Sequence, residues 1–234
     1  MQKIQHCLDC KDVMKKRILI LFFLFLVSLV HGQTQNTLDK TYYLLGTLDD
    51  YWSGYRTKRI ETSWKYILSI HQEDIGKIKR IEEVTMLKFT KRERVEGCYN
   101  CHEYYELYSL ETSKILNSFY DFIKKRGFYH DRKLKCSKIL KASKEQQYSF
   151  MAGLFLTHGE KIGDVYKIIL YNSPCRYECT IKILKVLNSK NVSSEIVTKG
   201  VPFGYFIKFE PSEELKQILD NEIERRDFFT NEKL

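Results

Sequence analysis

Proline and flexible linkers are what this sequence has least of. Its 234 residues include three prolines, and no stretch is rich in both glycine and serine. Because linkers between domains are usually built from such residues, their absence predicts one continuous domain after the N-terminal segment, at 33–234. A candidate internal seam lies between Gly127 and Gln147, where lysines and polar residues interrupt the apolar pattern.

Common catalytic motifs are also missing. The sequence contains no G-x-S-x-G, P-loop, H-E-x-x-H or glycine-rich nucleotide fingerprint, each of which carries a specific chemistry. The reactions that depend on those motifs are excluded, and the catalytic residues stay unknown. We therefore expect a protein that is not an enzyme, with a hydrolase of unrecognised site as an alternative.

Long hydrophobic runs are limited to one, Ile18–Val30, which follows three basic residues at positions 15 to 17. Thirteen helical residues span about 20 Å, short of the roughly 30 Å hydrocarbon core of a bilayer. Val30 and Gly32 suit a small-residue cleavage site, so residues 1–32 are predicted to be an export signal. The alternative is an uncleaved anchor. Met14 fits a signal-peptide start better than Met1, because acids and cysteines lie between them.

The charge balance is basic but not concentrated. The chain carries a net charge of +9, from 39 Lys and Arg against 30 Asp and Glu. Removal of residues 1–32 takes away five cations and two anions, which leaves 34 against 28 and a net charge of +6. These charges are spread along the chain, and an exported protein rarely meets nucleic acid, so we predict no nucleic-acid partner.

Period-two patterns dominate the first half of the predicted domain. Apolar residues alternate between Thr41 and Leu110, which is typical of strands. The clearest series are Trp64, Tyr66, Leu68 and Ile70, then Tyr105 and Leu107, with a further strand at Val84–Thr90. Asp74–Glu83 is ambiguous and could form a short helix. These segments predict an antiparallel meander.

A helix and a second alternating region follow. Apolar residues on one helical face predict a helix at Ser113–Arg126, closed by Gly127. The next predicted elements are strands at Phe150–Thr157 and Asp164–Tyr171, a helix from Ser173–Pro174 to Asn188, strands at Val192–Thr198 and Phe203–Glu210, and a helix opened by Ser212. This order is β-β-α-β-β-α, so the predicted fold class is α+β.

Cys98, Cys101 and His102 form C-x-x-C-H, the pattern that attaches c-type haem through two thioethers with a histidine iron ligand. Met151, His130 and His158 are candidates for the second axial ligand. The pattern is equally met by a short disulfide in a hairpin loop, by pairing with other cysteines, or by redox or metal chemistry. We prefer the structural disulfide, expect no resident metal, and keep haem c as the alternative cofactor.

Three further cysteines bring the exported chain to five, an odd number. Cys175 and Cys179 lie on neighbouring turns of one predicted helix, where a bond between them is strained. Cys136 bonded to either of them is the expected link. Cys175 and Cys179 are too far along the sequence from Cys98 and Cys101 to form an ordinary zinc module with them.

Three short segments have a second interpretation. Asp49–Trp52 combines acids with aromatics and could line a sugar cleft or form a surface turn. Thr157–Lys161 could be a catalytic loop or a hairpin turn. Asn191–Ser193 matches an N-glycosylation acceptor.

These observations predict an exported binding protein of the cell envelope, periplasm or extracellular space that is not an enzyme and whose ligand is unknown. A mono-haem electron carrier that uses Cys98, Cys101 and His102 is the alternative. Contact with a membrane is expected only through an uncleaved signal segment.

Overall fold

A computed structural model describes residues 38–48, 66–92, 103–123, 131–198 and 203–232. They belong to one of the two units into which the chain divides, Leu38–Leu234. The predicted export segment lies outside the described residues, so it and the predicted domain bounds stay predictions. None of the described helices has both the length and the hydropathy needed to cross a bilayer.

The described elements mix helices with antiparallel sheets, which confirms the α+β class. In chain order they are α2 (Lys40–Thr47), β1 (Tyr66–His71), the short 3₁₀ helix η2 (Gln72–Asp74), α3 (Ile75–Thr85), β2 (Phe89–Lys91), β3 (Tyr104–Tyr108), α4 (Leu110–Asn117), β4 (Tyr120–Ile123), β5 (Asp131–Leu134), α5 (Cys136–Leu140), α6 (Lys144–His158), β6 (Gly159–Ile162), β7 (Val165–Tyr171), α7 (Pro174–Val186), β8 (Lys190–Val197), β9 (Gly204–Glu210) and α8 (Glu213–Asn231).

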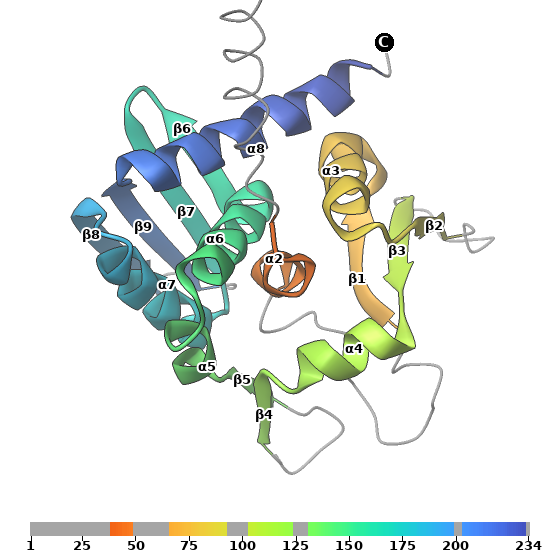
Figure 1. Cartoon of the computed structure of the whole chain (residues 1–234), viewed down its shortest axis with the longest axis horizontal. Helices are drawn as coiled ribbons and strands as arrows, with labels where there is room; N and C mark the ends of the chain where they lie inside the picture. Colours follow the sequence, from red (N-terminus) through yellow and green to blue (C-terminus); the bar gives the residue numbers. More distant parts are fainter. Residues whose placement is uncertain (1–37, 49–65, 93–102, 124–130, 199–202, 233–234) are drawn as a thin grey trace, which may run out of the picture. The chain divides into compact units, whose positions relative to one another are not determined.

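A parallel pair of helices, α2 and α6, lies at the centre of this unit (Figure 1). Both are capped at the same end. The Asp39 carboxylate accepts from two amides of α2, and Ser143 and Gln146 form a capping box on α6. The Gln146 amide also donates to Asp39 at 3.2 Å. The two helices therefore start together and run in the same direction.

Two glycines allow the helices of this pair to touch through their backbones. A Cβ on Gly46 would lie 2.2 Å from the Phe150 carbonyl oxygen, and one on Gly153 would lie 2.0 Å from that of Tyr43. The next neighbours are the Leu154 amide and the Thr47 amide, respectively. Residues 43 and 47 have the same positions relative to Gly46 as residues 150 and 154 have relative to Gly153. The two contacts are therefore equivalent, and an approximate two-fold axis passes between Gly46 and Gly153.

Each helix of the pair leads into a sheet of the same design. The second half runs α6-β6-β7-α7-β8-β9-α8 and forms a sheet in the order β6-β7-β9-β8. In the first half, the described elements run α2-β1-α3-β2-β3-α4, with sheet order β1-β3-β2. Every pairing in both sheets is antiparallel. Thus β1, β2 and β3 correspond to β7, β8 and β9, and the described fold is a duplication.

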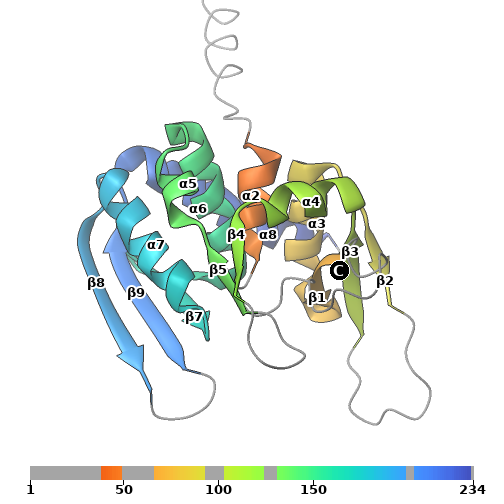
Figure 2. The same ribbon diagram turned by 90° about the horizontal axis from the view of Figure 1, so that it is seen from below.

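The core lies between these sheets and the helices. Figure 2 shows α7 alongside β8 and β9. Fully buried side chains come from both helices of the central pair and from alternate strand positions; they include Tyr43, Leu44, Phe150, Leu154, Tyr166, Ile168, Leu170, Ile207 and Phe209.

Several predicted elements are confirmed in the second half. The predicted 173–188 helix is α7, the predicted strands at 192–198 and 203–210 are β8 and β9, and Ser212 precedes α8. The predicted β-β-α-β-β-α order is also found, although its first strand is β6. In the first half, β1, α3 and β3 agree with the predicted strands and the ambiguous helix at Asp74–Glu83.

Four assignments are wrong. The first sheet has the order β1-β3-β2, with α3 between β1 and β2, so it is not the predicted meander. The predicted strand at Val84–Thr90 is mostly not a strand, because α3 extends to Thr85 and β2 begins at Phe89.

Phe150–Thr157 is part of α6 rather than a strand, because a helix buried on nearly all sides loses the 3.6-residue period and reads as a plain apolar run. The predicted Ser113–Arg126 helix ends early: α4 stops at Asn117, and β4 begins at Tyr120. The aromatic-rich segment after Ser118 favours a strand over a helix.

Candidate functional site

The four-stranded sheet keeps one face away from its helices. Side chains on one face pack beneath α6 and α7, whereas the other face presents residues that are half-buried or exposed. One row crosses this open face from β6 to β8 and consists of Glu160, Lys167, Lys208 and Ser193. The next row includes Ile169, Phe206 and Glu195. The open face is therefore a mixture of cations, acids, a hydroxyl and large apolar groups.

Two lysines face each other at the centre of this surface. Lys167 on β7 pairs directly with Lys208 on β9. Lys167 is bound to Glu160 at 2.6 Å and lies 5.6 Å from the centre of the Phe206 ring. Lys208 is exposed and has no ion pair within the described part of the chain. Like charges directly opposite each other on neighbouring strands destabilise a sheet, and an anionic ligand would relieve that cost.

The open face of the first sheet is rich in hydroxyls and aromatic rings. The register places Glu106 between Ser69 and Thr90, while His71 stacks edge-on against Tyr104. These groups can donate to or accept from a polar ligand in several directions. Both sheets thus offer polar open faces, although neither face has a large excess of positive charge.

A glutamate on the first sheet perturbs its tyrosine neighbour. The Tyr108 hydroxyl donates to Glu106, whose other oxygen lies 3.4 Å from Arg92. Burial, followed by the hydrogen bond to the Glu106 carboxylate, raises the pKa of Tyr108 to about 12. Tyr108 therefore remains a neutral hydrogen-bond donor at neutral pH.

A buried arginine secures the end of α2. Arg176, on α7, is fully buried, and its guanidinium donates to the carbonyls of Leu45 at 2.9 Å and Gly46 at 3.2 Å. It also donates to the Tyr120 hydroxyl at 2.9 Å and lies over the Phe150 ring. A cation at the last carbonyls of a helix is favoured by the helix dipole. Arg176 thereby connects α7 with both helices of the central pair and with β4.

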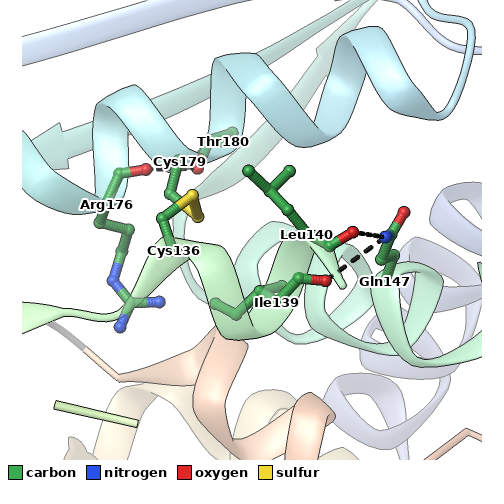
Figure 3. The surroundings of a disulfide bond; sticks show 7 residues. All are labelled: Cys136, Ile139, Leu140, Gln147, Arg176, Cys179 and Thr180. Carbon is green, nitrogen blue, oxygen red and sulfur yellow. Dashed lines mark hydrogen bonds between the residues drawn. A yellow bond between two sulfur atoms is a disulfide. The ribbon is translucent and has the colours of Figure 1, made fainter. Parts of the chain in front are cut away.

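A disulfide lies next to this arginine, as Figure 3 shows. It joins Cys136, the first residue of α5, to Cys179 on α7, with the two Cα atoms 5.4 Å apart. This is one of the two links expected for Cys136. Gln147 on α6 holds the other end of α5, since its amide donates to the carbonyls of Ile139 and Leu140.

A second buried ionic group joins α2, α3 and α8. Glu222 is fully buried, accepts from the Tyr43 hydroxyl at 2.6 Å, and forms an ion pair with Arg80. Burial lowers the pKa of Arg80, but the hydrogen bond and charge of Glu222 outweigh it, so the net shift is upward. Burial and Glu222 raise the pKa of Tyr43 well above its usual value. The group is charged and satisfied, which is typical of a structural network.

Asp220 on α8 forms a third polar group, with Lys161 at 2.7 Å and the Tyr166 hydroxyl at 2.5 Å. Burial raises the pKa of Asp220, but the hydrogen bonds from Lys161 and Tyr166 outweigh it and the net pKa is lowered. Burial, followed by the bond to Asp220, raises the pKa of Tyr166 to about 12. Asp220 thus ties the β6–β7 hairpin to α8.

The residues singled out from the sequence fall in different places. Cys98, Cys101 and His102 lie outside the described residues, between the paired strands β2 and β3, so their role stays a prediction. Asp49–Trp52 and His130 also lie outside them. Met151 is buried in α6, and His158 is the last residue of that helix rather than part of a hairpin turn. Asn191–Ser193 is in β8.

Proteins hold divalent ions with clusters of acidic, histidine or cysteine side chains. Among the residues that the structure describes, no group of three or more such side chains could hold an ion. The described residues therefore do not fit a metal centre, and no metal-dependent step is derived from them.

Comparison with known proteins gave structural neighbours only. No family model and no curated protein matches the sequence. Among solved structures, mesophilic variants of the homing endonuclease I-DmoI share 15% identity with this chain, over 81% of it and 97% of theirs, with a TM-score of 0.46. I-DmoI in complex with DNA and Mn shares 15% identity, over 77% of this chain and 92% of its own, with a TM-score of 0.43. I-DmoI with DNA and Ca gives a TM-score of 0.41 at 15% identity, over 75% and 83%.

These neighbours contradict the function predicted from the sequence. They are enzymes, whereas the predicted protein was a secreted or periplasmic binding protein that is not an enzyme, or a haem electron carrier. Two of the three were solved with DNA, whereas no nucleic acid was predicted as a partner. The same two were also solved with Ca or Mn, whereas the sequence predicted either no cofactor or, as the alternative, haem c. Each of these predictions is wrong, and the location of the protein stays a prediction.

Proposed function

We propose that this protein binds double-stranded DNA through the open faces of its two sheets. The observation that carries the proposal is the duplication of the fold about the Gly46–Gly153 contact, with one polar, open-faced sheet in each half. DNA is also the partner present in two of the I-DmoI structures named above. The argument, however, stands on the symmetry, shape and charge of this chain.

Symmetry supports a duplex as the ligand. The two strands of DNA are related by two-fold axes perpendicular to the helix, and proteins with two-fold related halves place equivalent elements on the two sides of such an axis. The central helix pair supplies that axis, and the sheets supply the equivalent elements. The major groove is about 12 Å wide and admits a two-stranded ribbon. β8 and β9 form a long antiparallel ribbon, with β8 exposed along nearly its whole length.

Charge and hydrogen-bonding groups support the same ligand. The net charge of +9 favours a polyanion. The strand register places Lys167 directly opposite Lys208. A phosphate oxygen bound by either lysine would reduce the repulsion between the two positive charges. Ser193 and, on the other sheet, Ser69 and Thr90 carry hydroxyls that suit phosphate or base edges. Because the cations are few, the expected affinity is moderate and strongly dependent on salt.

Fluorescence anisotropy with a labelled duplex of about 25 base pairs tests the proposal, at several NaCl concentrations. Lys208→Gln should weaken binding several-fold and reduce the slope of log K against log salt by about 1, the effect of one lost phosphate contact. Lys182→Gln is the matched control. It removes the same charge from an exposed position on α7, which lies against the opposite face of the sheet.

Lack of duplex binding by the wild-type protein at low salt would refute the proposal. Equal effects of Lys208→Gln and Lys182→Gln would show that the open face is not the binding surface, because general electrostatic attraction would then be enough to explain binding. The same reactions with added Mg²⁺ or Mn²⁺, resolved on denaturing gels, measure strand cleavage directly.

A further inference from the structure

The contact between α7 and the central helix pair depends on a group of residues that also contains the disulfide. Arg176 reaches the last carbonyls of α2 from the first turn of α7, and Cys179 lies about one turn further along the same helix. Figure 3 shows the two residues close together on α7, with α5 beside them. Whatever moves this part of α7 therefore moves the guanidinium that caps α2.

The anchors of α7 differ along its length. Towards its C-terminal end, Ile183, Leu184 and Leu187 are fully buried and hold the helix by apolar packing. Near its start, α7 carries Arg176, a buried charge that is stable only while carbonyl oxygens surround it. The covalent bond from Cys179 to Cys136 is the anchor nearest to that charge. Loss of this bond would therefore loosen the first half of α7 before the second.

The bond is placed so that it can be broken and formed again. Cys179 is fully buried, whereas Cys136 is half-buried at the start of α5. Cys136 is therefore the cysteine of the pair that a small reductant is expected to attack, and thiol–disulfide exchange begins with such an attack. The bond also encloses α6, β6 and β7, since its two cysteines are 43 positions apart.

We propose that the Cys136–Cys179 bond is a redox-sensitive lock on the junction of α2, α6 and α7. A dithiol reductant supplies the two electrons. Its first thiolate attacks the Cys136 sulfur, the S–S bond breaks, and Cys179 leaves as a thiolate. Its second thiol then displaces Cys136 from the mixed disulfide, so that the reductant ends as a cyclic disulfide and both cysteines take up protons. In the reduced protein, Arg176 releases the end of α2, and the two halves are held less firmly.

Hydrogen exchange followed by mass spectrometry tests the lock without any ligand. Full-length protein is compared before and after dithiothreitol, alongside Cys136→Ala, which removes a half-buried sulfur and suits a helix start. Peptides that cover α2 should exchange about tenfold faster after reduction, as expected when hydrogen bonds from a charged group are lost. Cys136→Ala should show the faster rate already and should not respond to dithiothreitol. Peptides from α3, which Arg80 ties to Glu222 of α8 and which has no bond to Arg176, should not change.

Two results would overturn the lock. One is an unchanged rate in α2 on reduction, and the other is an equal increase in α2 and α3, which would show general destabilisation. Duplex anisotropy on the same samples adds the functional consequence, which rests on the proposed function: reduction should weaken binding by wild type and leave Cys136→Ala unchanged. If the oxidised protein binds no duplex, the proposed function fails, while the exchange result still decides the lock.

Discussion

Gly46→Ala should destabilise this protein, although the same change stabilises most helices. A Cβ at position 46 would lie 2.2 Å from the Phe150 carbonyl oxygen and 2.7 Å from the Leu154 amide nitrogen. Real Cβ atoms essentially never come closer than 3.0 Å to such atoms. Because both obstacles are backbone, no side chain can rotate away, and the helices must separate by about 0.8 Å, the shortfall from that limit.

The cost follows from this separation. A gap of about 0.5–1 Å forfeits a quarter to a half of the dispersion energy of each affected contact, and overpacking of cores usually costs about 1–3 kcal/mol. Alanine regains about 1 kcal/mol through its better helix propensity. We expect a net loss of about 2 kcal/mol. With a slope of about 2 kcal/mol per molar urea, the unfolding midpoint should fall by about 1 M.

Urea unfolding followed by circular dichroism measures this loss. Gln217→Ala, at an exposed position of α8, is the control and should shift the midpoint little. Gly153→Ala should cost about as much as Gly46→Ala, because its Cβ meets the Tyr43 carbonyl at 2.0 Å. The double variant should cost much less than the sum, since one separation relieves both contacts. A midpoint for Gly46→Ala at or above that of wild type would refute the reasoning.

Two further predictions concern the ionic groups. Glu222→Gln removes the buried anionic partner of Arg80, leaves only the more exposed Glu83 to pair with it, and should cost about 3 kcal/mol in urea unfolding. Tyr43→Phe, which removes one hydrogen bond to Glu222, should cost about 1 kcal/mol, and a reversed ranking would contradict the charged network. Because the folded-state pKa of Asp220 is lowered, its stabilisation is present above its ordinary pKa and is lost as pH falls through the folded value. Asp220→Asn should therefore reduce the difference between the urea midpoints at about pH 6 and about pH 2.5, and an unchanged difference would assign that pH dependence to other carboxylates.

The sequence predicts the second half of the fold better than the first. Amphipathic elements such as α7, β9 and α8 show their period because each has one buried and one exposed face. α6 was assigned to a strand because it is buried on nearly every side, so the run around Phe150 has no polar face to reveal its period. The short helix α2 was not predicted for the same reason, because it packs through its backbone at Gly46 and most of its residues are buried.

The candidate site was not predictable from spacing. Lys167 and Lys208 belong to separate strands, and only the register of β7 on β9 places them opposite each other. Gly46 and Gly153, each in an apolar run, were the available signal, because glycine inside a helix marks a close approach of two backbones. The cysteine prediction succeeded in part, since Cys136 bonds to Cys179 as one of two alternatives. The role of Cys98, Cys101 and His102 stays a prediction.

For the proposed binding of duplex DNA, the duplication within one chain has a consequence for the choice of target. A dimer of identical subunits always presents the same surface twice, so its preferred DNA sites are palindromes. Here the half-copies are covalently joined and already differ: Lys167 and Lys208 occupy one open face, while hydroxyls and tyrosines occupy the other. Each half can mutate without altering its counterpart, so a site whose left and right arms have unrelated sequences is within reach of a single polypeptide.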